Sequence, residues 1–519
     1  MKHMKRFVSL ILALAMTLAM GISVLAAGNY TVTIKNESEG HTYEAYQVFA
    51  GDLAGNVLSN ISWGEGVNGD ALLTDLKEES AFADCKSAAD VAKVLEDNTA
   101  LAKTFASIAG KHLSQVSGTS SAAAAGYQIS GLEAGYYLIK DKDQSVPEGD
   151  SYTEFLLKVV KDITTEPKSD VPSVEKKVEE DDKYDQDGGY GNGYNDVADW
   201  NIGDKVPFKL IGTLPSNLAS YDTYKYIFHD TLSSGLTYQN DAKVYVVNGD
   251  SKQEVTGNFE INADGTSLTI SCDDIKKIAG VDANSKIVVE YTALLNKNAA
   301  IGLPGNPNEV YLEFSNNPNQ SGEGDHETGE TPEDKVIVFT YELDTTKVDG
   351  ESQEGLKDAE FKLRNEDGKY AIVEDGVLAG WADTEEEGSV LTSDENGLFK
   401  VAGLDDGTYY LKETKAPEGY NKLEEEIQIV ITATTSNGQN WTGTAGDALT
   451  ALKIQVGDQA EKDGDTSSGI VSAAIENNKG ATLPETGGIG TTIFYLVGGI
   501  LVIGACVMLI TKRRMNLHK

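Results

Sequence analysis

Cysteine and histidine are scarce in this chain, which has three cysteines and six histidines among 519 residues. Cys85, Cys272 and Cys506 lie far apart, so they provide no disulfide framework of the kind that stabilises small secreted domains. The few histidines form no cluster with metal-ligand spacing, and the chain lacks the Gly-x-Ser-x-Gly motif of serine hydrolases. We therefore expect no metal, no other cofactor and no catalytic turnover.

Basic residues are also few. The chain has 43 Lys and Arg against 82 Asp and Glu, which gives a formal net charge of −39 at pH 7. Nucleic acid and anionic lipid are disfavoured as partners of such a surface, because both carry negative charge. The same charge keeps a protein soluble at high local density.

An apolar run lies at each end of the chain. The first, over 7–25, follows three basic residues and ends in small residues, which predicts a secretory signal over 1–26 with cleavage after Ala26 or Ala27. The second, over 492–511, is long enough at about 1.5 Å per residue to cross a hydrocarbon core of about 30 Å. The basic tail 512–519 after it predicts a cytoplasmic end, so everything before the span lies outside the cell.

The pentapeptide Leu483-Pro484-Glu485-Thr486-Gly487 precedes this second run. Pentapeptide, apolar span and basic tail, in this order, resemble the wall-sorting signal of Gram-positive surface proteins. The resemblance implies that a sortase, a membrane transpeptidase with a cysteine nucleophile, cuts between Thr486 and Gly487 and transfers the threonine acyl group to an amine. We then expect a secreted, covalently wall-anchored surface protein with a transiently membrane-anchored precursor.

Two polar stretches punctuated by proline, over 164–172 and 316–335, divide the exported part into segments 28–165, 171–320 and 336–480. The first begins and ends in strand-like runs and has helical spacing between 88 and 113, which predicts a β-domain with a helical insertion. No residue set in it indicates chemistry.

Short, evenly spaced strand patterns in the second segment predict a β-sandwich. Its acidic loop, Glu179 to Asp199, contains Asp185-Gln186-Asp187, which resembles part of a calcium loop. The loop lacks the glycine and the closing glutamate of that motif, so we interpret it as a solvated loop.

In the third segment the run from Gly407 to Tyr420 resembles the E-box of Gram-positive pilins. The segment is similar to the B-type repeats of collagen adhesins, which implies tandem immunoglobulin-like sandwiches and an all-β fold. The resemblance also implies an isopeptide bond between Lys347 and Asn477, with Glu413 as the acid.

Strand alternation agrees with this assignment, because Glu413 shares a face with Tyr409 and Leu411, and Asn477 shares one with Ile475. Burial favours the uncharged forms of both amine and carboxyl group. A neutral Lys347 amine can therefore attack the Asn477 amide carbon while Glu413 passes protons to the departing ammonia.

A parallel trio is expected in the second segment. Resemblance to the middle domains of backbone pilins implies Lys176, Asp230 as the acid, and Asn316. Lys177 and Asn308 are the alternatives, since adjacent lysines of a strand face opposite ways and only one is expected inside.

Polymerisation requires an exposed amine, and Lys168 in the linker 166–170 resembles the acceptor of the pilin motif. The segment departs from that motif, with glutamate where tyrosine is usual and serine where asparagine is usual. Lys161 is the next candidate.

These features predict the structural backbone subunit of a covalent pilus, in which Thr486 is joined to Lys168 of the next subunit, head to tail. The expected partners are pilus-class and housekeeping sortases, further copies of the chain, accessory pilins and the peptidoglycan cross-bridge. The alternative is a monomeric wall-anchored adhesin that binds a host surface protein. The chain has neither the Asp-x-Ser-x-Ser signature of metal-dependent adhesion nor a run of near-identical repeats. Host binding and an isopeptide bond in the first domain are left open.

Overall fold

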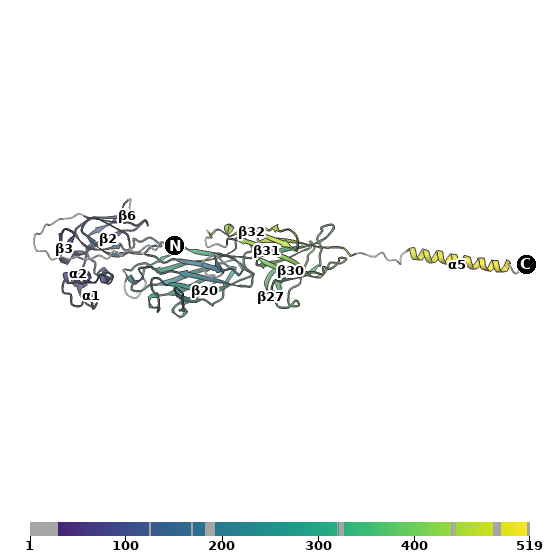
Figure 1. The fold of residues 1–519 in the computed structure, drawn as a ribbon, viewed down its shortest axis with the longest axis horizontal. Coiled ribbons are helices and arrows are strands. Elements are labelled where there is room, and N and C mark those ends of the chain that lie inside the picture. Colours follow the sequence, from purple (N-terminus) through teal and green to yellow (C-terminus); the bar gives the residue numbers. More distant parts are fainter. Residues whose placement is uncertain are drawn as a thin grey trace.

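The computed structural model describes residues 30–123, 126–167, 170–181, 193–318, 320, 326–436, 441, 443–480 and 489–515. Figure 1 shows three β-rich units in a row, followed by one helix at the far end. The signal peptide 1–26, Lys168, the motif 185–187 and the pentapeptide 483–487 lie outside the described residues.

The first unit packs two sheets against each other, with helices over the outer face of the larger one. The sheet orders are β5-β6-β1-β9 and β3-β2-β7-β8, the latter with β4 paired to β2. Its strands are β1 (Tyr30–Ile34), β2 (Tyr43–Ala54), β3 (Val57–Trp63), β4 (Gly118–Thr119), β5 (Ser121–Ala123), β6 (Gly126–Leu132), β7 (Gly135–Asp141), β8 (Glu154–Val159) and β9 (Ile163–Thr165). One core lies between the sheets, and a second lies between the larger sheet and the helices.

The helical insertion predicted over 88–113 is present as α2 (Ala88–Asp97), the 3₁₀ turn η1 (Thr99–Leu101) and α3 (Ala102–Gly110). A further helix, α1 (Gly69–Leu76), precedes them. Ser87 caps α2 by accepting a hydrogen bond from the Asp90 N–H at 3.2 Å, which satisfies a backbone donor that the helix leaves unpaired.

The middle unit is a sandwich of two seven-stranded sheets around one apolar core. The first sheet has the order β11-β10-β13-β20-β16-β17, with β15 on β20, and the second has β12-β23-β21-β14-β19-β18, with β22 on β21. The strands are β10 (Val174–Glu179), β11 (Tyr194–Asn195), β12 (Val197–Asp199), β13 (Lys205–Gly212), β14 (Tyr226–Leu232), β15 (Leu236–Tyr238), β16 (Lys243–Asn248), β17 (Ser251–Glu254), β18 (Glu260–Asp264), β19 (Ser267–Cys272), β20 (Lys286–Leu295), β21 (Asn306–Ser315), β22 (Thr328–Glu330) and β23 (Asp334–Phe339); short 3₁₀ turns are η2 (Leu218–Ser220), η3 (Thr256–Asn258) and η4 (Ile275–Lys277).

The middle unit extends past the boundary at 320 that composition predicts. Strand β23 pairs with β21 and β12, and so completes the second sheet of the middle unit. Ile337 and Phe339 on β23, and Val197 on β12, pack into the core of the third unit. Among the described residues of 316–335 are the short strand β22 and the start of β23, and the middle and third units share a packed boundary.

The third unit has one eleven-stranded sheet with the order β33-β32-β31-β30-β25-β26-β27-β29-β24-β34, and β28 pairs with β25. Its elements are β24 (Tyr341–Asp349), β25 (Glu360–Asn365), β26 (Tyr370–Glu374), β27 (Val377–Ala382), β28 (Leu391–Thr392), β29 (Leu398–Leu404), β30 (Gly407–Lys415), β31 (Ile427–Thr435), α4 (Ala445–Ala448), β32 (Leu449–Val456), β33 (Lys462–Asp463) and β34 (Ile470–Asn477). The first strand, β24, runs parallel to the last, β34. This parallel pair brings the two ends of the unit together.

The last helix, α5 (Ile489–Met515), extends away from the β-rich units (Figure 1). Its stretch Ile493–Met515 is long and apolar enough to cross a membrane. This stretch covers most of the span predicted at 492–511, and it includes the first basic residues of the tail. All three cysteines are free, with Cys85 and Cys272 buried in different units.

Candidate functional site

A buried lysine lies beside an asparagine and a glutamate in the third unit. Lys347 on β24 donates from Nζ to Asn477 Oδ1 on β34 at 2.5 Å, and its Nζ lies 3.3 Å from Glu413 Oε1 on β30. Asn477 Nδ2 donates to the same Glu413 oxygen at 3.0 Å. All three side chains are at most 1% exposed. Strand alternation had predicted both inward-facing side chains, Glu413 and Asn477, and the structure brings these three residues into contact.

The surroundings of Lys347 favour its neutral amine. Burial lowers the pKa of Lys347, and the Glu413 charge only partly offsets this effect. The Phe361 ring lies 5.5 Å from Nζ, so the amine has an apolar wall on one side. A neutral amine has the free lone pair that attack on an amide carbon requires.

The middle unit has a second buried cluster. Lys176 on β10 contacts Asp230 Oδ2 on β14 through Nζ, and it donates to the Tyr291 hydroxyl on β20 at 3.2 Å. Asn308 on β21 donates from Nδ2 to the same hydroxyl at 2.7 Å. The Asn308 Oδ1 atom is buried and has no hydrogen-bond partner among the described groups. Lysine, acid and amide thus meet around Tyr291, a residue that no sequence pattern singled out.

The proton balance within this cluster favours a neutral amine. Burial lowers the pKa of Lys176, and it raises the pKa of Asp230 against the opposing charge of the lysine. Both shifts favour transfer of the proton from the amine to the carboxyl group. Lys176 therefore resembles Lys347 in having a pKa that burial lowers.

The assignment of Asn316 from the sequence is corrected by the structure. Asp230 pairs with Val310 on β21, and Asn316 lies six residues further along, about 20 Å away at the rise of a strand. Asn316 instead lies where the first and middle units meet, and its carbonyl accepts the Tyr152 N–H at 2.7 Å. Asn308 occupies the place expected for Asn316.

Lys176 and Lys177 do face opposite ways, but both are buried, contrary to the expectation that only one lies inside. Lys177 donates to Asp196 Oδ1 at 2.5 Å and is 5% exposed. The reason is that the chain around Asp196 covers the outer face of β10. Only Lys176 contacts an acid of the inner core.

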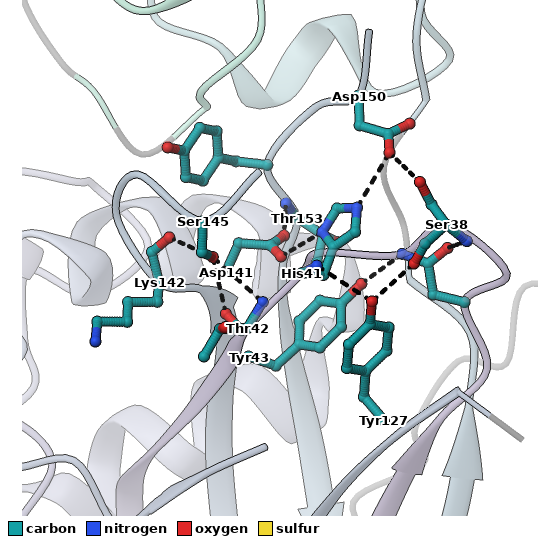
Figure 2. Close-up of polar contacts among 12 residues, drawn as sticks. Ser38, His41, Thr42, Tyr43, Tyr127, Asp141, Lys142, Ser145, Asp150 and Thr153 are labelled. Carbon is teal, nitrogen blue, oxygen red and sulfur yellow. Dashed lines mark hydrogen bonds and ion pairs between the residues drawn. The ribbon is translucent and has the colours of Figure 1, made fainter. Parts of the chain in front are cut away.

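The described part of the first unit has no lysine among its buried polar residues. A lysine–asparagine cluster like the other two is therefore not formed by residues 30–123 and 126–165. Its buried polar centre is His41, which lies between Asp141 and Asp150 (Figure 2). Sequence reasoning missed this group because His41 and Asp141 are 100 residues apart and only the pairing of β2 with β7 brings them together.

Three carboxylates gather between the middle and third units. Asp199 at the end of β12 and Asp405 and Asp406 in the β29–β30 turn offer oxygen atoms within 4.8 Å of one another. Burial, followed by the charge of Asp199, raises the pKa of Asp405 well above its usual range. Ca²⁺ takes six to eight oxygen ligands in all, from carboxylates, carbonyls and water, so these three side chains would supply only part of such a site.

Hydrogen bonds hold the chain just after position 168 and just before the pentapeptide. Beside position 168, Asp170 Oδ2 accepts the Ser216 N–H at 2.8 Å, and the Asp170 carbonyl accepts from Ser151 Oγ at 3.0 Å. Lys161, the other acceptor candidate, is exposed. Before the pentapeptide, Gly480 donates its N–H to the Gly419 carbonyl at 2.9 Å.

Three family models match separate parts of the chain. Residues 202–318 match the Gram-positive pilin backbone subunit 2, Cna-B-like domain, and residues 341–444 match a prealbumin-like fold domain. Residues 475–516 match the LPXTG cell wall anchor motif.

The trypsin-resistant surface T6 protein of Streptococcus pyogenes serotype M6 is 24% identical over 368 residues, which are 60% of this chain and 65% of that protein. The solved T6 backbone pilin of serotype M6 matches with 19% identity and a TM-score of 0.50, over 87% of this chain and 98% of that one. The major pilin SpaD of Corynebacterium diphtheriae matches with 20% identity and a TM-score of 0.47, over 89% and 99%. The chain spans about two thirds of the T6 protein in the sequence match.

An all-β chain with Cna-B-like and prealbumin-like domains and a terminal LPXTG motif is a wall-anchored surface protein of Gram-positive type. Within that class, the middle unit carries a domain of the Gram-positive pilin backbone type, and the chain is similar to the T6 protein over 368 residues. These matches confirm the predicted fold class and agree with the predicted resemblance to Gram-positive pilins.

Proposed function

We propose that this chain is the shaft subunit of a covalent pilus, joined head to tail by a sortase. The Thr486–Gly487 peptide bond breaks, the threonine acyl group passes through a thioester on the sortase cysteine, and an amide bond forms to Lys168 Nζ of the next subunit. The new amine of Gly487 leaves with the membrane span. The last subunit is transferred in the same way to the amine of a peptidoglycan cross-bridge.

The match of the middle unit to the pilin backbone model, combined with the anchor motif, is the observation that carries this proposal. The positions of Asp170 and Gly480, the hydrogen-bonded residues next to the two predicted joining points, also support it. Asp170 lies at the junction of the first and middle units, whereas Gly480 follows the last strand of the third unit. The units lie in a row (Figure 1), so donor and acceptor segments flank two units and repeated joining extends a fibre.

We further infer two intramolecular isopeptide bonds, Lys347 to Asn477 and Lys176 to Asn308. In each, the neutral Nζ attacks the amide carbon Cγ, the C–Nδ2 bond breaks, and ammonia leaves with a proton relayed by Glu413 or Asp230. The contacts of both lysines with their acids support this chemistry. Each bond forms once within its own chain, so the protein is a substrate and not an enzyme.

An immunoblot of wall material from the producing strain, boiled in detergent, tests the polymer. We expect a high-mass ladder in the wild type and in a Lys161→Ala strain, and collapse to the monomer in a Lys168→Ala strain. A ladder that collapses only in Lys161→Ala moves the acceptor to Lys161. Monomer alone in every strain would overturn the polymer and support the wall-anchored adhesin instead.

A further inference from the structure

Strand alternation places Asn477 on the inner face of β34, but it does not fix how far β34 is shifted along β24. In the observed register Lys347 is opposite Ile475, and Asn477 is opposite Asp349, the last residue of β24. A shift of two residues would keep Asn477 on the inner face but move its amide about 7 Å along the strand, out of reach of the lysine. The contact between Lys347 and Asn477 therefore depends on whatever sets this register.

The carboxylate of Asp349 accepts from four donors at this end of the two strands. Asp349 is 3% exposed. Its Oδ2 accepts the Tyr420 hydroxyl at 2.6 Å and lies 3.0 Å from Lys479 Nζ. Its Oδ1 accepts the N–H groups of Glu351 and Ser352 at 2.8 and 2.9 Å. Thus Oδ1 stabilises the turn after β24, whereas Oδ2 bonds to two residues from other parts of the chain.

The two partners of Oδ2 belong to the segments that meet at the end of β34. Lys479 lies just past the end of that strand, and Tyr420 lies in the loop between β30 and β31. An isolated antiparallel bridge pairs Tyr420 with Lys479, and Asn421 donates its N–H to the Asn478 carbonyl at 3.0 Å. Asp349 therefore connects β24 both to the end of β34 and to the loop that borders it.

The same loop also holds the acid of the buried cluster. Leu423 donates its N–H to Glu413 Oε2 at 2.7 Å. Glu413 Oε1 lies 3.3 Å from Lys347 Nζ and accepts from Asn477 Nδ2 at 3.0 Å. Asp349 is thus placed where the strand of the lysine, the strand of the asparagine and the loop that holds the acid come together.

The electrostatics strengthen these contacts. The hydrogen bonds from the Tyr420 hydroxyl, the turn N–H groups and Lys479 hold the pKa of Asp349 well below its usual range. Asp349 is therefore a carboxylate at neutral pH, and hydrogen bonds to a charged acceptor are stronger than those between neutral groups. A two-residue shift of β34 would carry Lys479 about 7 Å along the strand and break its contact with Asp349.

We propose that Asp349 is a positioning residue for the bond between Lys347 and Asn477. Together with Tyr420 and Lys479 it locks the register of β34 on β24, which holds the amide carbon within reach of the amine. This inference rests on the proposed function, in which that bond forms. The lock raises the fraction of folded chains in which the reacting groups are aligned, and the rate of bond formation follows that fraction.

The rate of bond formation in the exported chain 28–480 tests this role. The chain is made by cell-free synthesis and quenched in acid over time, and the fraction of tryptic peptide in which 347 is linked to 477 is measured by mass spectrometry. Asp349→Asn retains an Oδ1 for the two turn N–H groups but loses the charge that faces Tyr420 and Lys479. We expect this variant to form the bond about tenfold more slowly, since loss of a charge-assisted hydrogen bond changes an equilibrium by at least about that factor.

Further variants separate the register lock from a general effect on the fold. Tyr420→Phe removes only the hydroxyl and leaves the turn intact, so we expect a similar loss of rate. Lys479→Gln is expected to slow the bond by at most about fivefold, because the lysine is partly exposed, and Lys479→Arg retains the charge and the wild-type rate. The matched control is Asp465→Asn, which alters an aspartate that accepts a turn N–H before the start of β34 and is expected to react at the wild-type rate.

Circular dichroism and tryptophan fluorescence establish that each variant is folded, and Tyr420→Phe decides if Asp349→Asn is not. Wild-type rates in Asp349→Asn and Tyr420→Phe would overturn the proposal. An equal loss of rate in Asp465→Asn would also overturn it, because any weakening of the unit would then have the same effect. If the wild type itself has no linked peptide, the proposed bond fails and the positioning role fails with it, whereas a linked wild type with unaffected variants overturns the positioning role alone.

Discussion

Lys347 Nζ and Asn477 Oδ1 lie 2.5 Å apart on neighbouring parallel strands, although 130 residues separate them in the sequence. Parallel pairing of a first and a last strand requires the whole unit to fold before the two side chains meet. We therefore expect the proposed bond at this site to form late, after the third unit has folded.

We expect the intact exported chain to be lighter than its sequence by two molecules of ammonia, and Lys347→Ala to be lighter by only one. By analogy with removal of a native disulfide, loss of the cross-link lowers the free energy of unfolding of the third unit by about 2–5 kcal/mol. Intact mass spectrometry and thermal unfolding measure both. The control is Lys400→Ala, which removes a half-exposed lysine paired with Glu342. The same mass deficit relative to its own sequence in Lys347→Ala as in the wild type would contradict the bond.

The choice between two asparagines of the middle unit is directly testable. Asn308→Ala is expected to remove the cross-link to Lys176, because its amide group lies in the buried cluster. Asn316→Ala is expected to leave the bond intact and to change stability by about 1 kcal/mol or less, since its Oδ1 has no hydrogen-bond partner among the described groups. A tryptic peptide linking 176 to 316 would reverse this assignment.

Replacing Glu413, the proposed acid of the third unit, tests whether it transfers protons or only positions the Asn477 amide. Glu413→Gln retains the size of the side chain but removes the proton relay, so we expect the Lys347–Asn477 bond to form at least about 100-fold more slowly, the lower range for loss of a general acid. The mass of freshly folded protein followed over time measures this rate. Glu476→Gln, on the same strand as Asn477 but facing outward, is the control. Bond formation at the wild-type rate in Glu413→Gln would exclude the glutamate as the acid.

Glu154 makes the stability of the first unit depend on pH. Burial raises its pKa from 4.5 to about 8, and the Lys140 charge opposes this shift. The folded unit holds a proton that the unfolded chain releases, so stability is complete below about pH 4.5 and is lost as the pH rises towards 8.

Glu154→Gln is therefore expected to stabilise the first unit at pH 8. It is also expected to make the free energy of unfolding of that unit less dependent on pH between about 4.5 and 8. Each pKa unit corresponds to about 1.4 kcal/mol, so the gain is on the order of a few kcal/mol at most. Thermal unfolding at several pH values measures it, with the exposed Glu78→Gln as control. If the stability of Glu154→Gln changes with pH as steeply as that of the wild type, the pH dependence belongs to another group.

Strand alternation was sufficient to predict that Glu413 and Asn477 face inward, because the side-chain period of a strand is fixed. The same alternation could not choose between Asn308 and Asn316, since residues of equal parity share a face along the whole strand. That choice depends on where Asp230 pairs with β21, which is set by tertiary packing. Tyr291 and His41 could not be found for a similar reason, as their roles depend on which distant strands become neighbours.

The parallel pairing of β24 with β34 also bears on how a shaft linked as proposed would carry mechanical force. With the two proposed links in place, tension would enter near Asp170, cross from Lys176 to Asn308, follow the chain to Lys347 and cross to Asn477. The strands between the two residues of each link would then carry no load. The first unit precedes Asp170 in the chain and would lie outside this load path, so its stability would not limit the strength of the proposed fibre.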